Sequence, residues 1–335
     1  MEKKIPAILI LCLCLMPVQI QAKSVTSGTD DNGNKWTYHT STKTLTFAGN
    51  KAISDFTLNG HDREPSWYRW SNKTEHIVIE EGITGIGRNA FADFVNAKTV
   101  VLPDSVKVIG EDAFENNQFL RTIKIPNGVV KIGNGAFAGC EKLKSIILPP
   151  KVKQVGSFAF CENVSEMIFP GTTSAMESSI LSGCYSITKV VLPPKIKEIK
   201  KYDFHNCKKL KKLTIPKSVK TVSMSAFAGS GLKKIVLPEN VTTIKNGDAG
   251  RKVFQYIKGV GYPTKNLRVI KIHSKKIKSI QKNSFSGLSS KVVIKVPKSK
   301  KKKYTKMLRK SGLSKKVKIV AIEKKICEKT IMDKK

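Results

Sequence analysis

A phenylalanine that recurs every 23 residues constrains this chain more than any other feature of its sequence. The spacing holds over four consecutive positions, shortens once to 21 residues, and then resumes. The members of the series are Phe91, Phe114, Phe137, Phe160, Leu181, Phe204 and Phe227. A fixed period of roughly 20–50 residues is typical of repeat architectures, in which each unit buries its apolar face only by stacking on its neighbours. The period therefore predicts a solenoid instead of a globular domain.

The repeat unit contains a short strand, a proline and a turn. In the unit from 210 to 230, Leu213-Thr214-Ile215 predicts the strand, and Pro216 ends it because proline cannot donate to a β-ladder. Ala226 and Phe227 form the turn that follows. A glycine four residues before the aromatic position recurs at Gly87, Gly110, Gly133 and Gly156. This recurrence predicts either a positive φ or a close backbone approach at that position.

The pattern resembles a known bacterial repeat. The chain matches the consensus L-x-x-[IV]-x-[IL]-P-x-x-[VI]-x-x-[IV]-G-x-x-A-F-x-x-C best at 99–117, 120–140 and 143–160. This consensus is similar to the BspA-like, treponemal-type leucine-rich repeat, and the likeness covers roughly residues 35–322. The resemblance implies a leucine-rich-repeat solenoid with a parallel β-sheet on its concave side and short strands or turns on its convex side. It also implies an N-terminal β-rich cap, a C-terminal α/β cap, and adhesion or host-interaction roles for some family members.

The chain divides into five segments on this basis. They are 1–22 (signal peptide), 23–73 (N-terminal cap), 74–290 (about nine repeats, with an irregular insertion at 246–266), 291–322 (C-terminal cap) and 323–335 (basic tail). Tyr304, Met307 and Leu308 have the helical spacing that predicts a helix docked on the open end of the stack. The insertion predicts a projecting loop, which is either a binding element or a tolerated surface feature.

The first 22 residues have the features of a secretory signal. Lys3 and Lys4 precede an apolar run at 7–16, and Ala22 ends a segment suited to cleavage. The run is short for a membrane span, and no second apolar run of spanning length follows it. We therefore expect a secreted, extracellular protein, with association to the cell wall as an open alternative and no membrane span in the mature chain.

The charge is strongly positive and unevenly distributed. The chain has 61 Lys+Arg, 25 Asp+Glu and a formal net charge of +36. Residues 23–120 carry 10 basic and 13 acidic residues, whereas residues 121–335 carry 49 basic and 11 acidic ones. A polycation of this kind attracts anionic partners, although a solvated basic surface is the plainer interpretation.

The cysteines follow the repeat. Cys140, Cys184 and Cys207 each lie three residues after the aromatic position, and Cys161 lies one residue after Phe160. This placement predicts small buried packing residues with free thiols. A disulfide between neighbouring repeats stays open as the alternative, because a secreted chain permits one.

No pattern in the chain predicts catalysis. The five histidines are scattered over different repeats, and none has metal-ligand spacing. No nucleophile, base and orienting group occur together in a recognisable arrangement. The sequence therefore predicts no catalytic residue, no metal site and no cofactor, and the chain is not expected to be an enzyme.

Two rows of equivalent positions vary between repeats and are the candidate binding residues. The middle residue of each strand is expected to face outward, forming a concave ladder of Val101, Lys124, Ile147, Ile168, Val191, Thr214 and Val236. The positions just before the strands form a basic rim of Lys98, Arg121, Lys144, Lys189, Lys211, Lys212, Lys233, Lys234 and Arg268. Strand propensity alone is the competing interpretation of the aliphatic ladder.

Two functions fit these rows. The first is an adhesin-like, non-enzymatic module that binds a host or bacterial surface protein or glycan. The alternative is a cell-wall-associated protein whose basic rim and tail hold an anionic polymer such as teichoic acid or a sulfated glycan. Nucleic acid is less well supported, because the rim has no interleaved aromatic residues for base stacking.

Overall fold

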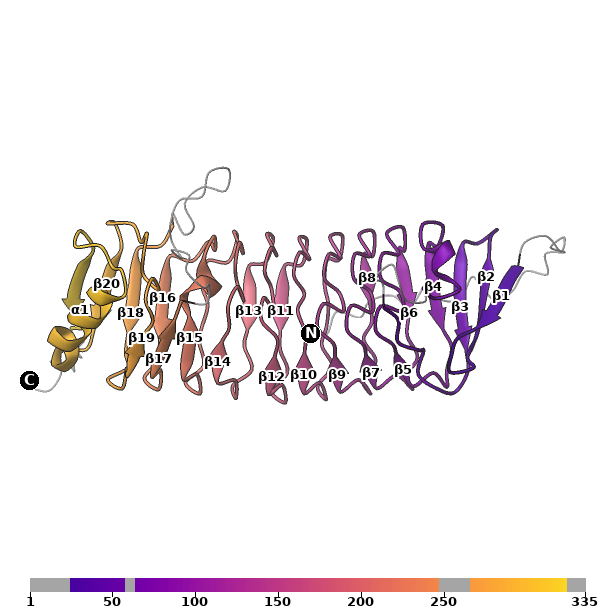
Figure 1. The fold of residues 1–335 in the computed structure, drawn as a ribbon, viewed down its shortest axis with the longest axis horizontal. Helices are drawn as coiled ribbons and strands as arrows, with labels where there is room; N and C mark the ends of the chain where they lie inside the picture. The colour runs from indigo at the N-terminus through magenta and orange to yellow at the C-terminus, as the bar shows by residue number, and fades with distance from the viewer. Residues whose placement is uncertain (1–24, 58–63, 247–265, 324–335) are drawn as a thin grey trace, which may run out of the picture.

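The computed structural model describes residues 25–57, 64–246 and 266–323. Over these residues the chain winds into an elongated stack of coils, with antiparallel strands at one end and a short helix at the other (Figure 1). The predicted signal peptide, nearly all of the insertion and nearly all of the basic tail lie outside the described residues. The predicted leucine-rich-repeat solenoid is confirmed, because each repeat forms one coil that pairs with its neighbours through parallel strands.

One ladder of strands, called the first ladder below, follows the predicted strand positions. It consists of a six-stranded, a two-stranded and a four-stranded segment. Its strands are β1 (Val25–Thr29), β2 (Lys35–His39), β3 (Thr44–Ala48), β4 (His76–Ile79), β6 (Thr99–Val101), β8 (Thr122–Ile123), β11 (Glu166–Ile168), β13 (Lys189–Val191), β16 (Lys234–Leu237), β18 (Val269–Ile272), β20 (Val293–Val296) and β21 (Lys318–Ala321). Every pair after β3 is parallel, and equivalent repeat positions therefore lie side by side.

The second ladder lies later in each coil and is built from shorter strands. It has a five-stranded and a four-stranded segment. Its strands are β5 (Gly85–Ile86), β7 (Val108–Ile109), β9 (Lys131–Ile132), β10 (Gln154–Val155), β12 (Ala175–Met176), β14 (Glu198–Ile199), β15 (Thr221–Ser223), β17 (Thr243–Lys245) and β19 (Ser279–Ile280). The glycine row lies at the ends of these strands, and a Cβ on Gly110 would stand 2.6 Å from the backbone carbon of Gly87. Close backbone approach, not a positive φ, is therefore the reason for these glycines.

The aromatic series forms the centre of the core, with one correction. Phe91, Phe114 and Phe137 stack with ring centroids 5.4 and 5.6 Å apart. The next member is Phe158, whose ring lies 5.8 Å from that of Phe137. Phe160, which the period of 23 predicts for this place, is instead 53% exposed. The short interval of 21 residues therefore falls one repeat earlier than expected.

The cause of this shift is the turn geometry around the buried ring. The residue two positions after the ring adopts a left-handed conformation, and Asp93, Asn116 and Gly139 occupy it in the preceding repeats. These residue types tolerate positive φ. Phe160 stands at this position after Phe158, with φ 60°, because two residues are missing between Gly156 and the ring.

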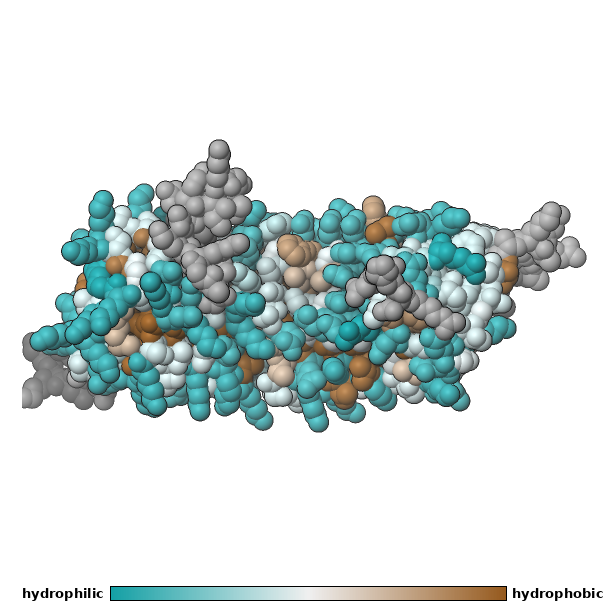
Figure 2. All heavy atoms as spheres, in the orientation of Figure 1, coloured by the Kyte–Doolittle hydropathy of each residue, from teal (hydrophilic) through white to brown (hydrophobic). Residues whose placement is uncertain are grey.

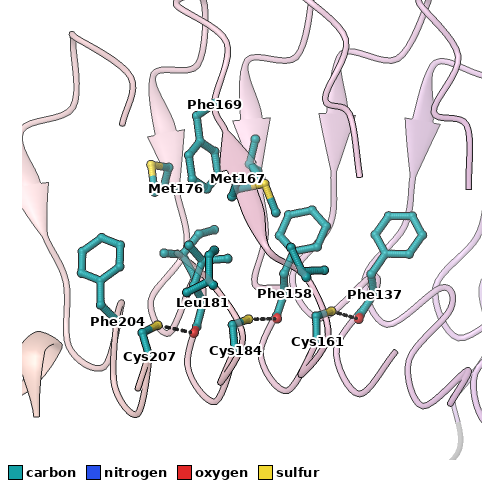
Figure 3. Packing of buried hydrophobic residues seen from close by; sticks show 14 of the residues in the cluster. Phe137, Phe158, Cys161, Met167, Phe169, Met176, Leu181, Cys184, Phe204 and Cys207 are labelled. Atoms are coloured by element: carbon teal, nitrogen blue, oxygen red, sulfur yellow. Dashed lines mark hydrogen bonds between the residues drawn. The ribbon is translucent and has the colours of Figure 1, made fainter. Parts of the chain in front are cut away.

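With Phe158 as the ring position, all four described cysteines lie three residues after a core side chain. Each thiol is buried and donates to the carbonyl oxygen of the preceding core residue. The Sγ–O distances are 3.4 Å for Cys140 to Phe114, 3.0 Å for Cys161 to Phe137, 3.2 Å for Cys184 to Phe158 and 3.2 Å for Cys207 to Leu181. Figure 3 shows the last three of these contacts. The prediction of free, buried thiols is confirmed for these four cysteines.

Both ends of the stack are closed by the predicted kinds of cap. At the N-terminal end, β1, β2 and β3 form an antiparallel meander, followed by the short helix η1 (Tyr68–Trp70). Trp67 packs edge-on against Phe47 and donates its indole N–H to the Ala90 carbonyl at 2.9 Å. These contacts bind the meander to the first coils.

At the C-terminal end, η3 (Lys298–Lys300) leads into α1 (Lys301–Lys310), and β21 pairs with β20. Tyr304 and Leu308 are buried, and Met307 packs against the core from a half-buried position. The Tyr304 hydroxyl accepts from the backbone N–H of Ile277 at 3.0 Å and donates to the Ser274 carbonyl at 3.2 Å. The predicted docking of this helix on the open end is confirmed.

Two predicted strands of the first ladder do not form, the one around Ile147 and the one at Leu213-Thr214-Ile215. Leu213-Thr214-Ile215 pairs with neither β13 nor β16, so the first ladder is interrupted there. Its side chains still alternate, with Thr214 exposed and Ile215 buried. Later in the same coil, the 3-10 helix η2 (Met224–Phe227) carries the last ring of the aromatic series, at 6.2 Å from Phe204.

Candidate binding face

The outward side of the first ladder carries a row of exposed aliphatic side chains. Ile147 is 81% exposed, Ile168 51% and Val191 43%, and these three residues belong to consecutive coils. Ile168 and Val191 are direct register partners on β11 and β13. Aliphatic side chains of this size usually pack in a core. Because these three side chains are exposed to water instead, they are available to a partner. We call Ile147, Ile168 and Val191 the aliphatic patch.

The other predicted members of the ladder differ in their surroundings. Val101 is also exposed, but the exposed Lys124 separates it from the aliphatic patch. On the C-terminal side of the patch, Thr214 is exposed and Val236 is half-buried. The structure thus gathers three of the seven predicted ladder residues into one apolar group. Figure 2 shows hydrophobic residues gathered in small groups on an otherwise hydrophilic surface.

Two hollows open at this patch where the first ladder is interrupted, one inside it and one beside Val191. Ser145 forms a single bridge with Thr122, and no strand of the described chain joins residues 145–148 to β11. A hollow of about 370 Å³ opens there between Ile147 and Ile168. A second, of about 470 Å³, lies between Val191 and Thr214. The first interruption falls in the shortened repeat, where the strand positions are 21 residues apart instead of 23.

The nine residues of the predicted basic rim are all exposed, but they are not equivalent. Lys98 forms an ion pair with Glu75, which also pairs with Lys43 at 2.6 Å. Hydrogen bonds from Lys43 and then Lys98 lower the pKa of Glu75 to about 2. Lys189 pairs with Glu166 at 3.0 Å. Two of the predicted cations are therefore already neutralised by carboxylates one repeat away.

The positive charge of the rim is concentrated towards the C-terminal half. Lys211, Lys212, Lys233 and Lys234 lie on adjacent coils, and within the described chain none of the four forms an ion pair. Like charges on adjacent coils repel each other, and an anionic ligand relieves that repulsion. The rim is thus a cationic surface from Lys211 onward and a mixed surface before it.

Burial shifts the pKa values of several titratable groups inside the described coils. Burial raises the pKa of the Cys140 thiol to about 12, which makes it a poor nucleophile. Asp203 replaces the alanine before the ring position, and burial raises its pKa to about 8. Over residues 25–57, 64–246 and 266–323, no group of three or more His, Cys, Asp or Glu side chains is placed to hold a metal ion. None of the helices in these ranges is long and apolar enough to cross a membrane.

Comparison with known proteins identifies the family to which these coils belong. The sequence profile of the BspA type leucine rich repeat region, in six copies, matches residues 64–162, 155–260 and 255–332. The chain belongs to the BspA-type leucine-rich repeat family. The resemblance seen in the sequence is thereby confirmed.

Solved structures show the same fold. A leucine-rich repeat protein from Eubacterium ventriosum superposes with a TM-score of 0.55 at 20% identity, covering 82% of this chain and 84% of that one. A leucine-rich repeat protein from Bacteroides ovatus superposes with a TM-score of 0.51 at 21% identity, covering 91% and 79%. No curated protein matches the chain. The likeness to these structures concerns the fold alone.

Proposed function

We propose that this BspA-type protein is a secreted or cell-surface binding protein, adhesin-like and non-enzymatic, that binds a protein or glycan partner on the outward side of the first ladder. The observation that carries the proposal is the aliphatic patch with one hollow inside it, between Ile147 and Ile168, and a second beside Val191. An apolar row with a hollow inside it and another beside it gives partner side chains places to insert. Buried anchors of that kind supply most of the affinity of protein interfaces. The signal-like first 22 residues support placement outside the cell.

Aspartate substitutions in the patch test this proposal. The chain from residue 23 onward is assayed against immobilised mucin, fibronectin and purified cell wall by biolayer interferometry. We expect binding to at least one of these surfaces, and we expect Ile147→Asp and Val191→Asp to abolish it while the melting temperature stays close to that of the wild type.

Val108→Asp provides the matched control. Val108 is an exposed valine on β7 of the second ladder, so the substitution adds the same charge away from the patch. Binding that survives both patch substitutions unchanged would contradict the proposal.

A second candidate function is supported by the rim. The four lysines at 211, 212, 233 and 234, together with the +36 net charge, favour a polyanion-binding protein retained on the cell wall by charge. Affinity of this kind falls steeply as salt rises, because bound cations are released from the polymer. We expect wall association to be lost in high salt and on charge reversal of Lys144, Lys211 and Lys233. Wall binding that is unchanged in high salt would exclude this function.

A further inference from the structure

A hollow near the C-terminal cap lies outside both predicted rows. It has a volume of about 540 Å³ and is lined by His273, Lys275, Pro297, Lys298, Ser299 and Ile322. Three adjacent parallel strands, β18, β20 and β21, end at this place: His273 follows β18, Pro297 follows β20 and Ile322 follows β21. We call this hollow the C-terminal groove. It is built from regular strand ends, because His273 N–H donates to the Leu237 carbonyl at 2.9 Å and Ile322 N–H to that of Val296 at 2.8 Å.

Two lysines and a histidine line the groove. His273, Lys275 and Lys298 are exposed to solvent within it. Lys271 lies two residues before His273 and is in register with Lys295 on the adjacent strand. Within the described chain, none of these four lysines forms an ion pair. Directly opposed like charges on neighbouring strands are destabilising, and Lys271 and Lys295 are such a pair on the two strands that lead to the groove.

The charges that act on His273 come from each neighbouring element. Lys271 on β18 and Lys234 on β16 disfavour its protonation, and Glu239 after β16 favours it. Glu239 also pairs with Lys217 at 3.6 Å. Lys275 and Lys298 face the same hollow from the segments after β18 and β20. Glu239 is thus one carboxylate against four lysines, at 234, 271, 275 and 298.

We infer that the C-terminal groove binds phosphate groups of a linear phosphate-bearing polymer. Lysine ammonium groups bind phosphate as point charges, and hydrogen bonds between ionised partners are roughly twice as strong as neutral ones. Ser299 adds a hydroxyl donor, and the protonated imidazole adds two N–H donors. Phosphate oxygens are more basic than sulfate oxygens and accept these bonds better. The inference rests on the second candidate function, to which it adds a defined site and ligand.

The site predicts a specific pH dependence. Burial, followed by the charges of Lys271 and Lys234, lowers the pKa of His273 below its ordinary value. The imidazole is therefore neutral near pH 7 and gains its proton on acidification. A bound anion favours the charged form, so affinity for phosphate polymer should increase as the pH falls from about 8 to about 5.5. His273→Gln should remove this increase.

The test uses the chain from residue 23 onward and inorganic polyphosphate as the probe, with affinity measured by fluorescence anisotropy at about 0.15 M salt. Lys275→Gln with Lys298→Gln removes two groove charges. Lys151→Gln with Lys195→Gln removes two exposed charges elsewhere and is the matched control. We expect about a tenfold loss of affinity for the groove pair, and less than about a threefold loss for the control pair.

Heparin serves as a sulfated probe in a parallel titration, and each outcome is decisive. Equal losses of affinity for the groove and control pairs would contradict binding at the groove, but not polyanion binding by the protein. A loss at the groove for heparin but not for polyphosphate would overturn the choice of phosphate. Absence of polyphosphate binding by the wild type would overturn the inference, and absence of binding to both probes would overturn the second candidate function as well.

Discussion

The ring of Phe158 lies parallel to that of Phe137, with centroids 5.8 Å apart and an interplanar angle of 3°. Phe160, two residues later, is exposed and left-handed. The burial of Phe158 and the exposure of Phe160 show which of the two residues occupies the ring position in the shortened repeat. It also brings Cys161 into line with the other described cysteines, since each then follows a core side chain by three residues.

Alanine substitutions distinguish the two phenylalanines. Phe158→Ala leaves a cavity inside the ring stack and should cost about 3–5 kcal/mol of unfolding free energy. Phe160→Ala removes a side chain that is mostly in water and should cost less than about 1 kcal/mol. Urea denaturation of the two variants checks this. Equal losses, or a larger loss at Phe160, would show that the register is wrong.

Phe160 should also be replaceable with a gain in stability. A left-handed conformation costs most L-residues roughly 1–2 kcal/mol, and the cost is smaller for asparagine. Asn116 and Asn206 occupy the same turn position in other coils, at φ 56° and 59°. We expect Phe160→Asn to raise the unfolding free energy by about 0.5–1 kcal/mol, partly offset by loss of the contact between Phe160 and Gly183. A decrease of more than about 1 kcal/mol would contradict this explanation of the turn.

Asp203 should make stability fall as pH rises. Its pKa is about 8 in the folded chain because of burial, against about 3.9 in an unfolded chain. Between these values the folded state holds a proton that the unfolded state has lost. The stabilisation is therefore fully present at low pH and decreases by at most about 1.4 kcal/mol per pH unit up to about pH 8.

Asp203→Asn keeps the shape of the side chain and removes the titration, so it is the control. Denaturation of both proteins at pH 5, 6.5 and 8 gives the difference attributable to this one group. We expect the unfolding free energy of the variant to increase steadily relative to that of the wild type as the pH rises. Parallel pH profiles for the two proteins would show that Asp203 does not titrate in this way.

The stacked cysteines should be inert until the coil opens. Burial raises the pKa of the thiols of Cys140 and Cys184 to about 12. A Cys327→Ser variant of the chain from residue 23 onward carries only the four described thiols. We expect no reaction with Ellman's reagent at pH 8 in buffer and reaction of all four in guanidinium. Reaction of a thiol in the folded protein would indicate local opening of its coil.

Much of this fold could be predicted because each coil must bury the same apolar positions against its neighbours. The period predicts the solenoid, and the spacing of Tyr304 and Leu308 predicts the capping helix. The period alone could not choose between Phe158 and Phe160, since two residues were missing and both positions carry the same residue type. The left-handed turn decides between them, and it depends on backbone geometry.

The binding face was predicted in part. Exposure of the ladder residues Ile147, Ile168 and Val191 follows from strand alternation. The hollows beside them depend on ladder pairs that fail to form, which a residue pattern does not reveal. The pairing of Lys98 with Glu75 and of Lys189 with Glu166 could have been found, because each carboxylate lies 23 residues before its lysine. The C-terminal groove forms where three strands end, so the residue pattern of a single repeat does not indicate it.

The most direct test of the proposed function is the affinity of the wild type and of Ile168→Asp for the same immobilised surface, measured side by side at low and high salt. Ile168 lies at the centre of the aliphatic patch, between the two other members. We predict saturable binding by the wild type and a loss of at least about tenfold in the variant at both salt concentrations. Equal affinities for the two proteins would contradict the account.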